Sequence, residues 1–148
     1  MGARAAQKKS GDLVIEADEL WSFVGRKRDR WWVWVAIDAD TRQVVAMVAG
    51  DRSERTCRCL WDALPVGYRD RAVVATDFWR AYRAVIPEER HAAAGKAAGL
   101  TAHVERFFFT VRQRCARFVR KTLPFSRKVE NHGGALWYFI RQYNLCRA

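Results

Sequence analysis

Three carboxylates stand in distinctive runs of the sequence and could together bind divalent metal ions. Asp18 lies in EADELWSFVG, Asp77 in VVATDFWRAY and Glu105 in TAHVERFFFTVRQR. Hard cations such as Mg²⁺ prefer carboxylate oxygens and keep water and phosphate as their other ligands. Two such ions, about 3.5–4 Å apart, can activate a nucleophilic oxygen and stabilise a leaving oxygen when a phosphodiester is cleaved. Two Asp and one Glu are therefore sufficient for phosphodiester chemistry.

Each of these carboxylates also has an ordinary structural explanation. Asp77 follows a short apolar run, where Asp commonly caps a helix or makes a turn. Glu105 falls in the first turn of a predicted helix, where the helix dipole favours an acid. Asp18 is harder to explain, because a charge within an apolar strand is costly unless it is paired or bound to metal. Composition alone does not exclude five rival carboxylates, which are Asp12, Glu16, Glu19, Asp38 and Asp51.

Hydrophobic patterns predict the elements that must position these residues. Three strands are expected first, followed by a helix that starts at a capping Asp51 and ends before Pro65. A short buried strand, a short helix and a Gly- and Ala-rich mobile loop come next, and then a long amphipathic helix and a last helix. The predicted strands cover residues 13–24, 31–37, 44–49 and 72–76, the helices 51–64, 79–86, 102–121 and 126–143, and the loop 92–99.

This order of elements is the layout of an RNase H-like α/β fold. In that fold the fourth strand lies parallel to the first, and helices flank a mixed five-stranded sheet of order 3-2-1-4-5. The strand order reverses between strands one and four, and open α/β sheets place their sites at such a switch point, by the carboxyl ends of the strands. Asp18 on strand one and Asp77 after strand four are therefore expected beside the same crevice.

The charge of the chain indicates a polyanion as partner. Lys plus Arg number 27 against 16 Asp plus Glu, which gives a net charge of +11. The surplus is concentrated at the C-terminal end, where Thr101 to Ala148 contain ten basic and two acidic residues. At 148 residues we expect one domain over 13–148, after a disordered basic start at 1–12.

Several classes of protein are excluded by the sequence. No apolar run approaches the roughly 18 residues needed to span a bilayer, and the N-terminus lacks the apolar segment of a signal peptide. No membrane partner is therefore expected, and the predicted location is the cytoplasm, in association with the nucleoid. Cys57, Cys59, Cys115 and Cys146 include no C-x-x-C pair and no His at zinc spacing. We expect reduced, mostly buried thiols rather than a zinc finger.

The three carboxylate runs together resemble the catalytic core of the insertion-sequence-one family of bacterial DDE transposases. The resemblance extends from about Ile15 to Asn144 and includes GDRSERTCRCLWDALP, the His91 segment and RKTLPFSRKVENHGGALWYFIRQYN. It implies a DNA transposase catalytic domain in which Asp18, Asp77 and Glu105 are catalytic and bind two Mg²⁺ or Mn²⁺ ions. On this hypothesis Asp77 bridges the two ions, while Asp18 and Glu105 complete one site each. Water would be the nucleophile for cleavage and a DNA 3′-hydroxyl the nucleophile for strand transfer.

The same resemblance implies contacts with double-stranded DNA. The expected partners are the terminal inverted repeats of the element and a target DNA, on which the protein is expected to self-associate. The basic side of the long helix is expected to contact phosphates through Arg106, Arg112, Arg114, Arg117, Arg120 and Lys121. Trp79 and Tyr82 match the family pattern, although core packing explains them as well as base stacking does. His91 and His103 could approach the site, but a lone His is more often structural.

The sequence departs from the family pattern near Glu105. The family usually has Asn at three positions that are Ala102, Phe108 and Phe109 here. Phe108 falls on the apolar stripe of the helix, whereas Ala102 removes a potential N-cap and Phe109 lies one turn beyond Glu105. Family members also carry a zinc-binding and helix-turn-helix module, often encoded in an upstream frame and joined by frameshifting. We expect such a module to recognise the terminal repeats, and this chain to bind DNA weakly and without sequence preference.

Two other functions are compatible with the residues. A basic DNA-binding remnant would keep the fold and not the chemistry, and substitution of Asp77 would then change nothing. An RNase H-like nuclease acting on RNA hybrids or junctions fits the three carboxylates equally well. The long resemblance outside the carboxylates argues against the nuclease, which would cleave without strand transfer.

Overall fold

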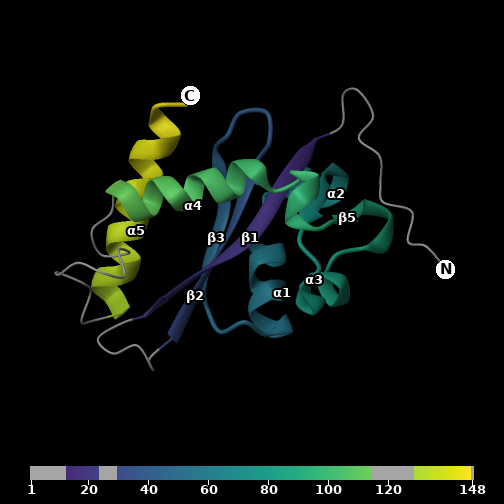
Figure 1. Ribbon diagram of the computed structural model, residues 1–148, viewed down its shortest axis with the longest axis horizontal. Coiled ribbons are helices and arrows are strands. Elements are labelled where there is room, and N and C mark those ends of the chain that lie inside the picture. The colour runs from purple at the N-terminus through teal and green to yellow at the C-terminus, as the bar shows by residue number, and fades with distance from the viewer. Residues whose placement is uncertain (1–12, 24–29, 115–128, 148) are drawn as a thin grey trace.

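The apolar runs near the N-terminus fold into three antiparallel strands (Figure 1). The computed structural model describes residues 13–23, 30–114 and 129–147. The strands are β1 (Val14–Phe23), β2 (Arg30–Asp38) and β3 (Val44–Gly50). β2 pairs with β1 on one side and with β3 on the other. Its residues Val33 to Asp38 are all buried, so both faces of this part of the strand are covered.

A helical crossover connects β3 to β4 (Val73–Thr76), which pairs in parallel with β1. Its first helix, α1 (Glu54–Ala63), was expected to start at Asp51, but Ser53 is the N-cap, with its hydroxyl accepting from the amide of Thr56 at 3.3 Å. Asp51 instead accepts hydrogen bonds from Ser53 and Thr56. A short second helix that the sequence did not predict, α2 (Val66–Arg71), follows Pro65.

The fifth strand occupies part of the predicted loop. β5 (His91–Ala93) pairs in parallel with β4, so the prediction of a loop throughout residues 92–99 is wrong. A three-residue strand of His and Ala has little strand signal of its own and depends on its neighbour for hydrogen bonds. The sheet order is β3-β2-β1-β4-β5, which confirms the predicted 3-2-1-4-5 order.

The remaining α-helices lie within the predicted ranges and are α3 (Arg80–Val85), α4 (Ala102–Arg114) and α5, which continues two residues past its predicted end (Val129–Leu145). Two short 3₁₀ helices, η1 (Glu88–Arg90) and η2 (Lys96–Ala98), were not predicted. Residues 115–121 of the predicted long helix, residues 126–128 of the predicted last helix and the predicted disordered start at 1–12 lie outside the described residues. No helix in the described part of the chain is long and apolar enough to cross a membrane.

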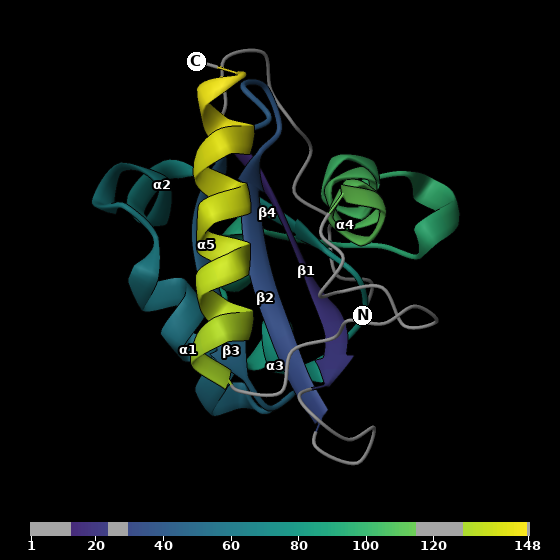
Figure 2. The ribbon, with the colours of Figure 1, turned by 90° about the vertical axis from the view of Figure 1, so that its left-hand side faces the viewer.

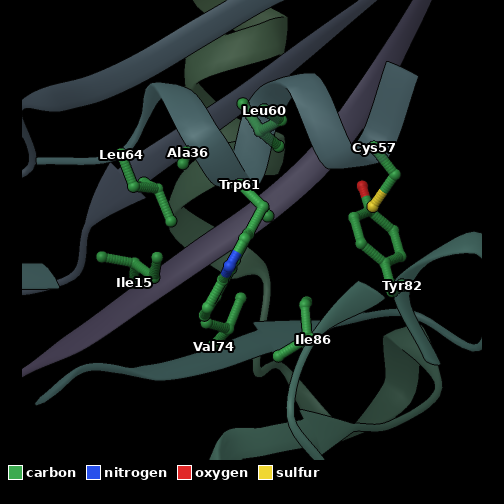
Figure 3. A pocket seen from close by; sticks show the side chains of 10 residues that line it. Ile15, Ala36, Cys57, Leu60, Trp61, Leu64, Val74, Tyr82 and Ile86 are labelled. Carbon is green, nitrogen blue, oxygen red and sulfur yellow. The ribbon is translucent and has the colours of Figure 1, made fainter. Parts of the chain in front are cut away.

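The two faces of the sheet carry separate hydrophobic cores. One core joins β1 and β2 to α1 and α3, and includes Trp34, Leu60 and Tyr82. The other joins the sheet to α4 and α5, and includes Phe107 and Leu136. Figure 2 shows α1 and α4 on opposite sides of the strands. A narrow gap in the first core, under α1, has apolar walls throughout (Figure 3), so it is part of the packing and not a ligand site.

The thiols are less buried than the sequence predicted. Cys57 is buried in the first core, and burial raises the pKa of its thiol to about 12. Cys59 and Cys146 are exposed, so the expectation of mostly buried thiols is wrong for the described cysteines. Cys59 is two residues beyond Cys57 on α1, which turns it about 200° away from the core.

Candidate active site

Asp18 and Asp77 come together because β1 and β4 are parallel neighbours. The pairing register runs from Val14 opposite Val73 to Glu16 opposite Ala75. Continued by two residues, the same register places Asp18 beside Asp77. β1 and β4 are also the strands between which the order of the sheet reverses, as expected for a site at a switch point.

The carboxylates form a compact acidic group. Oxygen atoms of Asp18, Glu19 and Asp77 all lie within 4.8 Å of one another. Asp18 and Asp77 are half-buried, and Glu19 is buried. Three acidic groups at this spacing offer a divalent cation the hard oxygen ligands that it prefers. The arrangement could therefore hold a metal ion.

Local hydrogen bonds orient the two aspartates. Asp18 Oδ1 accepts from the amide of Glu19 at 2.9 Å, and Asp77 Oδ1 accepts from the amide of Trp79 at 2.9 Å. The second bond, to the residue two positions on, is the turn role considered for Asp77 from the sequence. In each aspartate the local bond is accepted by a single oxygen, Oδ1.

A hydrogen-bonded chain from β5 fixes the backbone at Asp77. The hydroxyl of Thr76 donates to the carbonyl of Asp77 at 2.8 Å, and His91 Nε2 lies 2.6 Å from the same hydroxyl oxygen. Since the hydroxyl proton goes to Asp77, the ring nitrogen of His91 must be the donor. Burial, with a smaller effect of Arg83, lowers the pKa of His91. His91 thus supports Asp77 from behind as a neutral ring.

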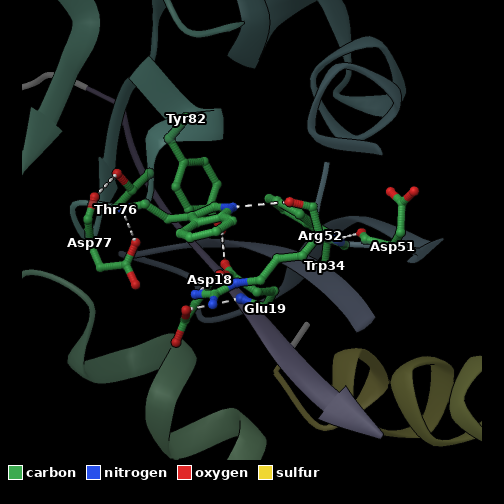
Figure 4. Close-up of polar contacts among 9 residues, drawn as sticks. Asp18, Glu19, Trp34, Asp51, Arg52, Thr76, Asp77 and Tyr82 are labelled. Atoms are coloured by element: carbon green, nitrogen blue, oxygen red, sulfur yellow. Dashed lines mark hydrogen bonds and ion pairs between the residues drawn. The ribbon is translucent and has the colours of Figure 1, made fainter. Parts of the chain in front are cut away.

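Glu19 points to the opposite face of β1 from Asp18. Its Oε1 accepts a hydrogen bond from Nε of Arg52 at 2.8 Å and forms an ion pair with Nη2 of the same residue at 2.8 Å. Its Oε2 accepts a hydrogen bond from the hydroxyl of Tyr82 at 2.6 Å (Figure 4). Burial raises the pKa of Glu19 above its ordinary value, and the bonds from Tyr82 and Arg52 partly offset this. Tyr82 is fully buried and packs edge-on against Trp34, which makes it a core residue and not a stacking platform for DNA bases.

Glu105 lies on α4 and outside this acidic group. Its Oε1 accepts from the hydroxyl of Thr101 at 3.4 Å, one turn earlier in the chain, and its side chain is half-buried. α4 packs across β1 and β2, so Glu105 is carried on the helix that covers the Asp18 face. The structure thus brings Asp18 and Asp77 together and places the third predicted carboxylate on a neighbouring element.

The N-terminus of α4 is tied to β1 by a buried acid. Glu16, 2% exposed, accepts from the amide of His103 at 2.9 Å and also contacts the Nδ1 atom of the His103 ring. Ala102 is the first helical residue, so the N-cap position belongs to Thr101 and not to Ala102, contrary to the sequence-based expectation. The carboxylate of Glu16 takes the capping role, because it accepts from the second helical amide.

The other predicted site residues have varied surroundings. Arg106, Arg112 and Arg114 are exposed on α4, whereas Arg117, Arg120 and Lys121 lie outside the described residues. Trp79 is half-buried, and its ring nitrogen donates to the carbonyl of Arg52 at 3.2 Å. Phe108 is buried in the second core as predicted, and Phe109 is 61% exposed.

Sequence reasoning gave no role to three residues that organise the site. Glu16 and Glu19 were considered only as rival carboxylates, and Arg52 was not singled out. Two buried acids on either side of Asp18, in an otherwise apolar strand, are the signal that could have found them, because buried acids require partners. Their partners are 33 and 87 residues away in the chain, beyond the reach of a local pattern.

Comparison with known proteins gives consistent results over most of the chain. The model of a family described as IS1 transposase matches residues 12–145. The insertion element iso-IS1n protein InsB of Shigella dysenteriae is 37% identical over 132 residues, covering 88% of this chain and 96% of that protein. The insertion element IS1 4 protein InsB of Escherichia coli K12 is 32% identical over 131 residues, covering 87% of this chain and 75% of that protein.

Two solved structures are similar to this chain at low sequence identity, and the first has the higher TM-score. A chain of the simian T-cell lymphotropic virus intasome, solved with the PP2A regulatory subunit B56 gamma, matches 90% of this chain and 51% of its own length, with a TM-score of 0.55 and 15% identity. The HTLV-2 integrase catalytic core domain, solved in complex with magnesium, matches 85% of this chain and 83% of its own length, with a TM-score of 0.45 and 14% identity. The fold is RNase H-like, as its sheet order also indicates.

Proposed function

We propose that this chain, which belongs to the IS1 transposase family, is a metal-dependent polynucleotidyl transferase that cleaves and joins DNA strands at the ends of an insertion sequence. The observation that carries the proposal is the acidic group at the β1–β4 switch point, where Asp18 and Asp77 lie together. Family membership supports this class of reaction. The acidic group supplies a place in the fold where that reaction could occur.

The donor set suits divalent ions of the Mg²⁺ and Mn²⁺ type. Asp18, Asp77 and Glu105 would hold such ions. When bound, the ions would supply activation of a water or a DNA 3′-hydroxyl and stabilisation of the leaving oxygen. The residues contribute position: His91 and Thr76 hold the backbone of Asp77, and Glu16 holds the helix of Glu105.

Glu19 is the structural rival of Glu105 for the third ligand, and its contacts argue against it. Arg52 donates Nε–H to one oxygen of Glu19 and forms an ion pair with the same oxygen through Nη2, and Tyr82 donates to the other oxygen. Both oxygens of Glu19 are therefore already engaged. Its side chain is also only 1% exposed. Glu105, half-buried on the face of Asp18, is the better candidate.

DNA is proposed to lie along the exposed side of α4. Arg106, Arg112 and Arg114 are exposed there. The helix starts beside Glu16, which lies two residues before Asp18 on β1. Basic side chains at such positions would neutralise phosphates and fix the register of the duplex without reading its sequence. Arg117, Arg120 and Lys121, which lie outside the described residues, are proposed as further phosphate contacts.

Substitution of Asp77 tests the proposed function. The whole chain is incubated with supercoiled plasmid and Mg²⁺, and the rate of nicking is measured for the unmodified protein, Asp77→Asn and the control Asp70→Asn. Asp70 is exposed on α2, which precedes β4, whereas Asp77 follows that strand. We expect Asp77→Asn to lower the rate more than about a hundredfold, since even outer-shell changes around metals cost 10- to 100-fold. Asp70→Asn should retain the rate.

A second measurement distinguishes loss of the metal site from loss of catalysis alone. Binding of Mn²⁺ is followed by electron paramagnetic resonance, and Asp77→Asn should weaken it at least tenfold. Unmodified protein that binds DNA, but neither binds Mn²⁺ nor nicks, would be a basic DNA-binding remnant and would overturn the proposal. Cleavage of RNA–DNA hybrids without joining of DNA 3′ ends would indicate a nuclease instead.

A further inference from the structure

Arg52 is held more firmly than a surface arginine requires. Its Nε donates to Glu19 Oε1 at 2.8 Å, and its Nη2 forms an ion pair with the same oxygen at 2.8 Å. The guanidinium also lies over the ring of Trp79, 3.8 Å from the centroid, and over the ring of Trp32, 4.6 Å from the centroid. A planar cation with aromatic contacts and a carboxylate on one edge has little freedom to change orientation.

The backbone beneath Arg52 is fixed by the same residue that orients Asp77. The amide of Trp79 donates to Asp77 Oδ1, and its indole nitrogen donates to the carbonyl of Arg52. The indole of Trp34 donates to the neighbouring carbonyl of Asp51 at 2.9 Å. Trp79 therefore sets the position of Arg52 relative to the carboxylate group.

Arg52 extends toward the acidic group while part of it stays in reach of solvent. Figure 4 shows its side chain passing from the Asp51 side toward Asp18 and Asp77. Its side chain is 35% exposed, whereas that of its partner Glu19 is 1% exposed. Among the described residues, no acceptor bonds to Nη1 of Arg52, so this edge keeps two N–H groups for an external ligand.

An external anion at this position has a clear need for a cation. A phosphodiester that approaches Asp18 and Asp77 meets carboxylates of its own charge, and like charges in contact repel. Neutralising Glu19 alone would not require the partial exposure of Arg52. A guanidinium fork is also the side chain that best matches phosphate oxygens.

We propose that Arg52 binds a DNA phosphate next to the Asp18–Asp77 carboxylates and that Glu19, Trp32 and Trp79 orient it for this contact. The inference rests on the proposed function, because it takes DNA as the ligand of this site. It assigns a role to the segment that starts α1, and it makes Glu19 a positioning residue.

The affinity for DNA without metal tests this inference separately from catalysis. The whole chain is titrated against a fluorescein-labelled duplex in EDTA, and the dissociation constant is measured by anisotropy at several salt concentrations. Arg52→Gln is compared with Arg71→Gln, which removes the same charge from an exposed position at the end of α2, just before β4. We expect Arg52→Gln to weaken binding about three- to tenfold and to reduce the salt slope by about 0.9, and Arg71→Gln to change affinity less than twofold.

A double variant removes the ambiguity of net charge and of folding. Glu19→Gln with Arg52→Gln keeps the net charge of the unmodified protein and leaves no buried carboxylate without its cation. It should fold, as circular dichroism would show, and still bind DNA about three- to tenfold more weakly. Arg52→Lys keeps the charge and loses the two-pronged guanidinium, so its affinity for DNA should lie between those of the unmodified protein and Arg52→Gln.

The possible outcomes separate the two proposals. Double-variant affinity equal to that of the unmodified protein, or equal losses for Arg52→Gln and Arg71→Gln, would overturn the role of Arg52. A different result would contradict the proposed function. In that case Asp77→Asn would nick DNA at the rate of the unmodified protein, independently of the effect of Arg52→Gln on DNA affinity in EDTA.

Discussion

Acidic side chains lie near both ends of β4, but the groups that surround them differ. Near the start of β4, the carboxylate of Asp38 accepts three hydrogen bonds. They come from the hydroxyl of Tyr68 at 2.6 Å and from the amides of Asp40 and Thr41 at 2.8 and 3.0 Å. After β4 ends, oxygens of Asp77 lie within 4.8 Å of those of Asp18 and Glu19.

The difference leads us to expect that Asp38 stabilises the fold more than Asp77 does. A carboxylate that accepts several hydrogen bonds favours the folded state, whereas acids that face other acids repel each other unless a cation joins them. Glu16 belongs with the first kind, since it holds the N-terminus of α4. The predictions below test this division, in order of decreasing effect.

Glu16→Ala should produce the largest loss of stability. The substitution leaves the amide of His103 without its acceptor, removes a helix cap and exposes the anchor of α4. We expect the free energy of unfolding to fall by about 2–3 kcal/mol, as measured by urea denaturation. Glu16→Gln keeps one acceptor oxygen and should lose less. Glu88→Ala, at an exposed position in η1, is the control, and an equal effect at both positions would contradict the anchoring role.

Asp38→Asn and Asp77→Asn should change the free energy of unfolding at neutral pH by amounts that differ in sign or size. Burial alone would raise the pKa of Asp38, but hydrogen bonds from Tyr68, Thr41 and Asp40 lower it below its usual 3.8. Its contribution to stability is therefore present above pH 3.8 and is lost as the pH falls through the lowered folded-state pKa. We expect Asp38→Asn to cost about 1 kcal/mol at pH 7 and progressively less below pH 3.8.

Asp77→Asn provides the contrast to Asp38→Asn. It removes one charge from an acidic group, so stability at pH 7 should stay the same or rise. Urea denaturation of both variants at pH 7 and pH 3.5 makes the comparison. A loss at Asp77 as large as at Asp38 would show that the two ends of β4 do not differ in this way.

Phe109→Asn should have the smallest effect. The ring is 61% exposed, and exposed substitutions usually change stability by less than about 0.5 kcal/mol. We also expect the nicking rate to change less than about threefold, because Phe109 lies on the exposed side of α4. Phe108→Asn, one residue earlier and 7% exposed, should instead cost more than about 2 kcal/mol. A large rise in nicking rate for Phe109→Asn would show that this departure limits the chain.

The sequence was most informative where local patterns determine structure. The apolar run of β2, the Pro65 stop after α1 and the stripe of Val104, Phe107 and Phe108 on α4 each produced the predicted element. β5 was missed because a strand of His and Ala needs β4 to define it. α2 was missed because six residues are too few to show a helical period.

The candidate site was predictable in part. Asp18 and Asp77 were expected together from the strand order, and the structure groups their oxygens. The partnership of Glu19 with Arg52 was not predictable, because it depends on which face of β1 each residue occupies and on a turn that two indoles hold in place. Such long-range pairings leave no periodic signal in a single sequence.

The parallel pairing of β1 with β4 also has a consequence for biosynthesis. Asp18 emerges from the ribosome well before Asp77, and the two carboxylates meet only when the crossover has closed. Contacts between distant segments form late, because the loop between them must first be ordered. A chain interrupted anywhere between Asp18 and Asp77 contains Asp18 without its companion, so such an unfinished copy of this protein lacks the paired acids.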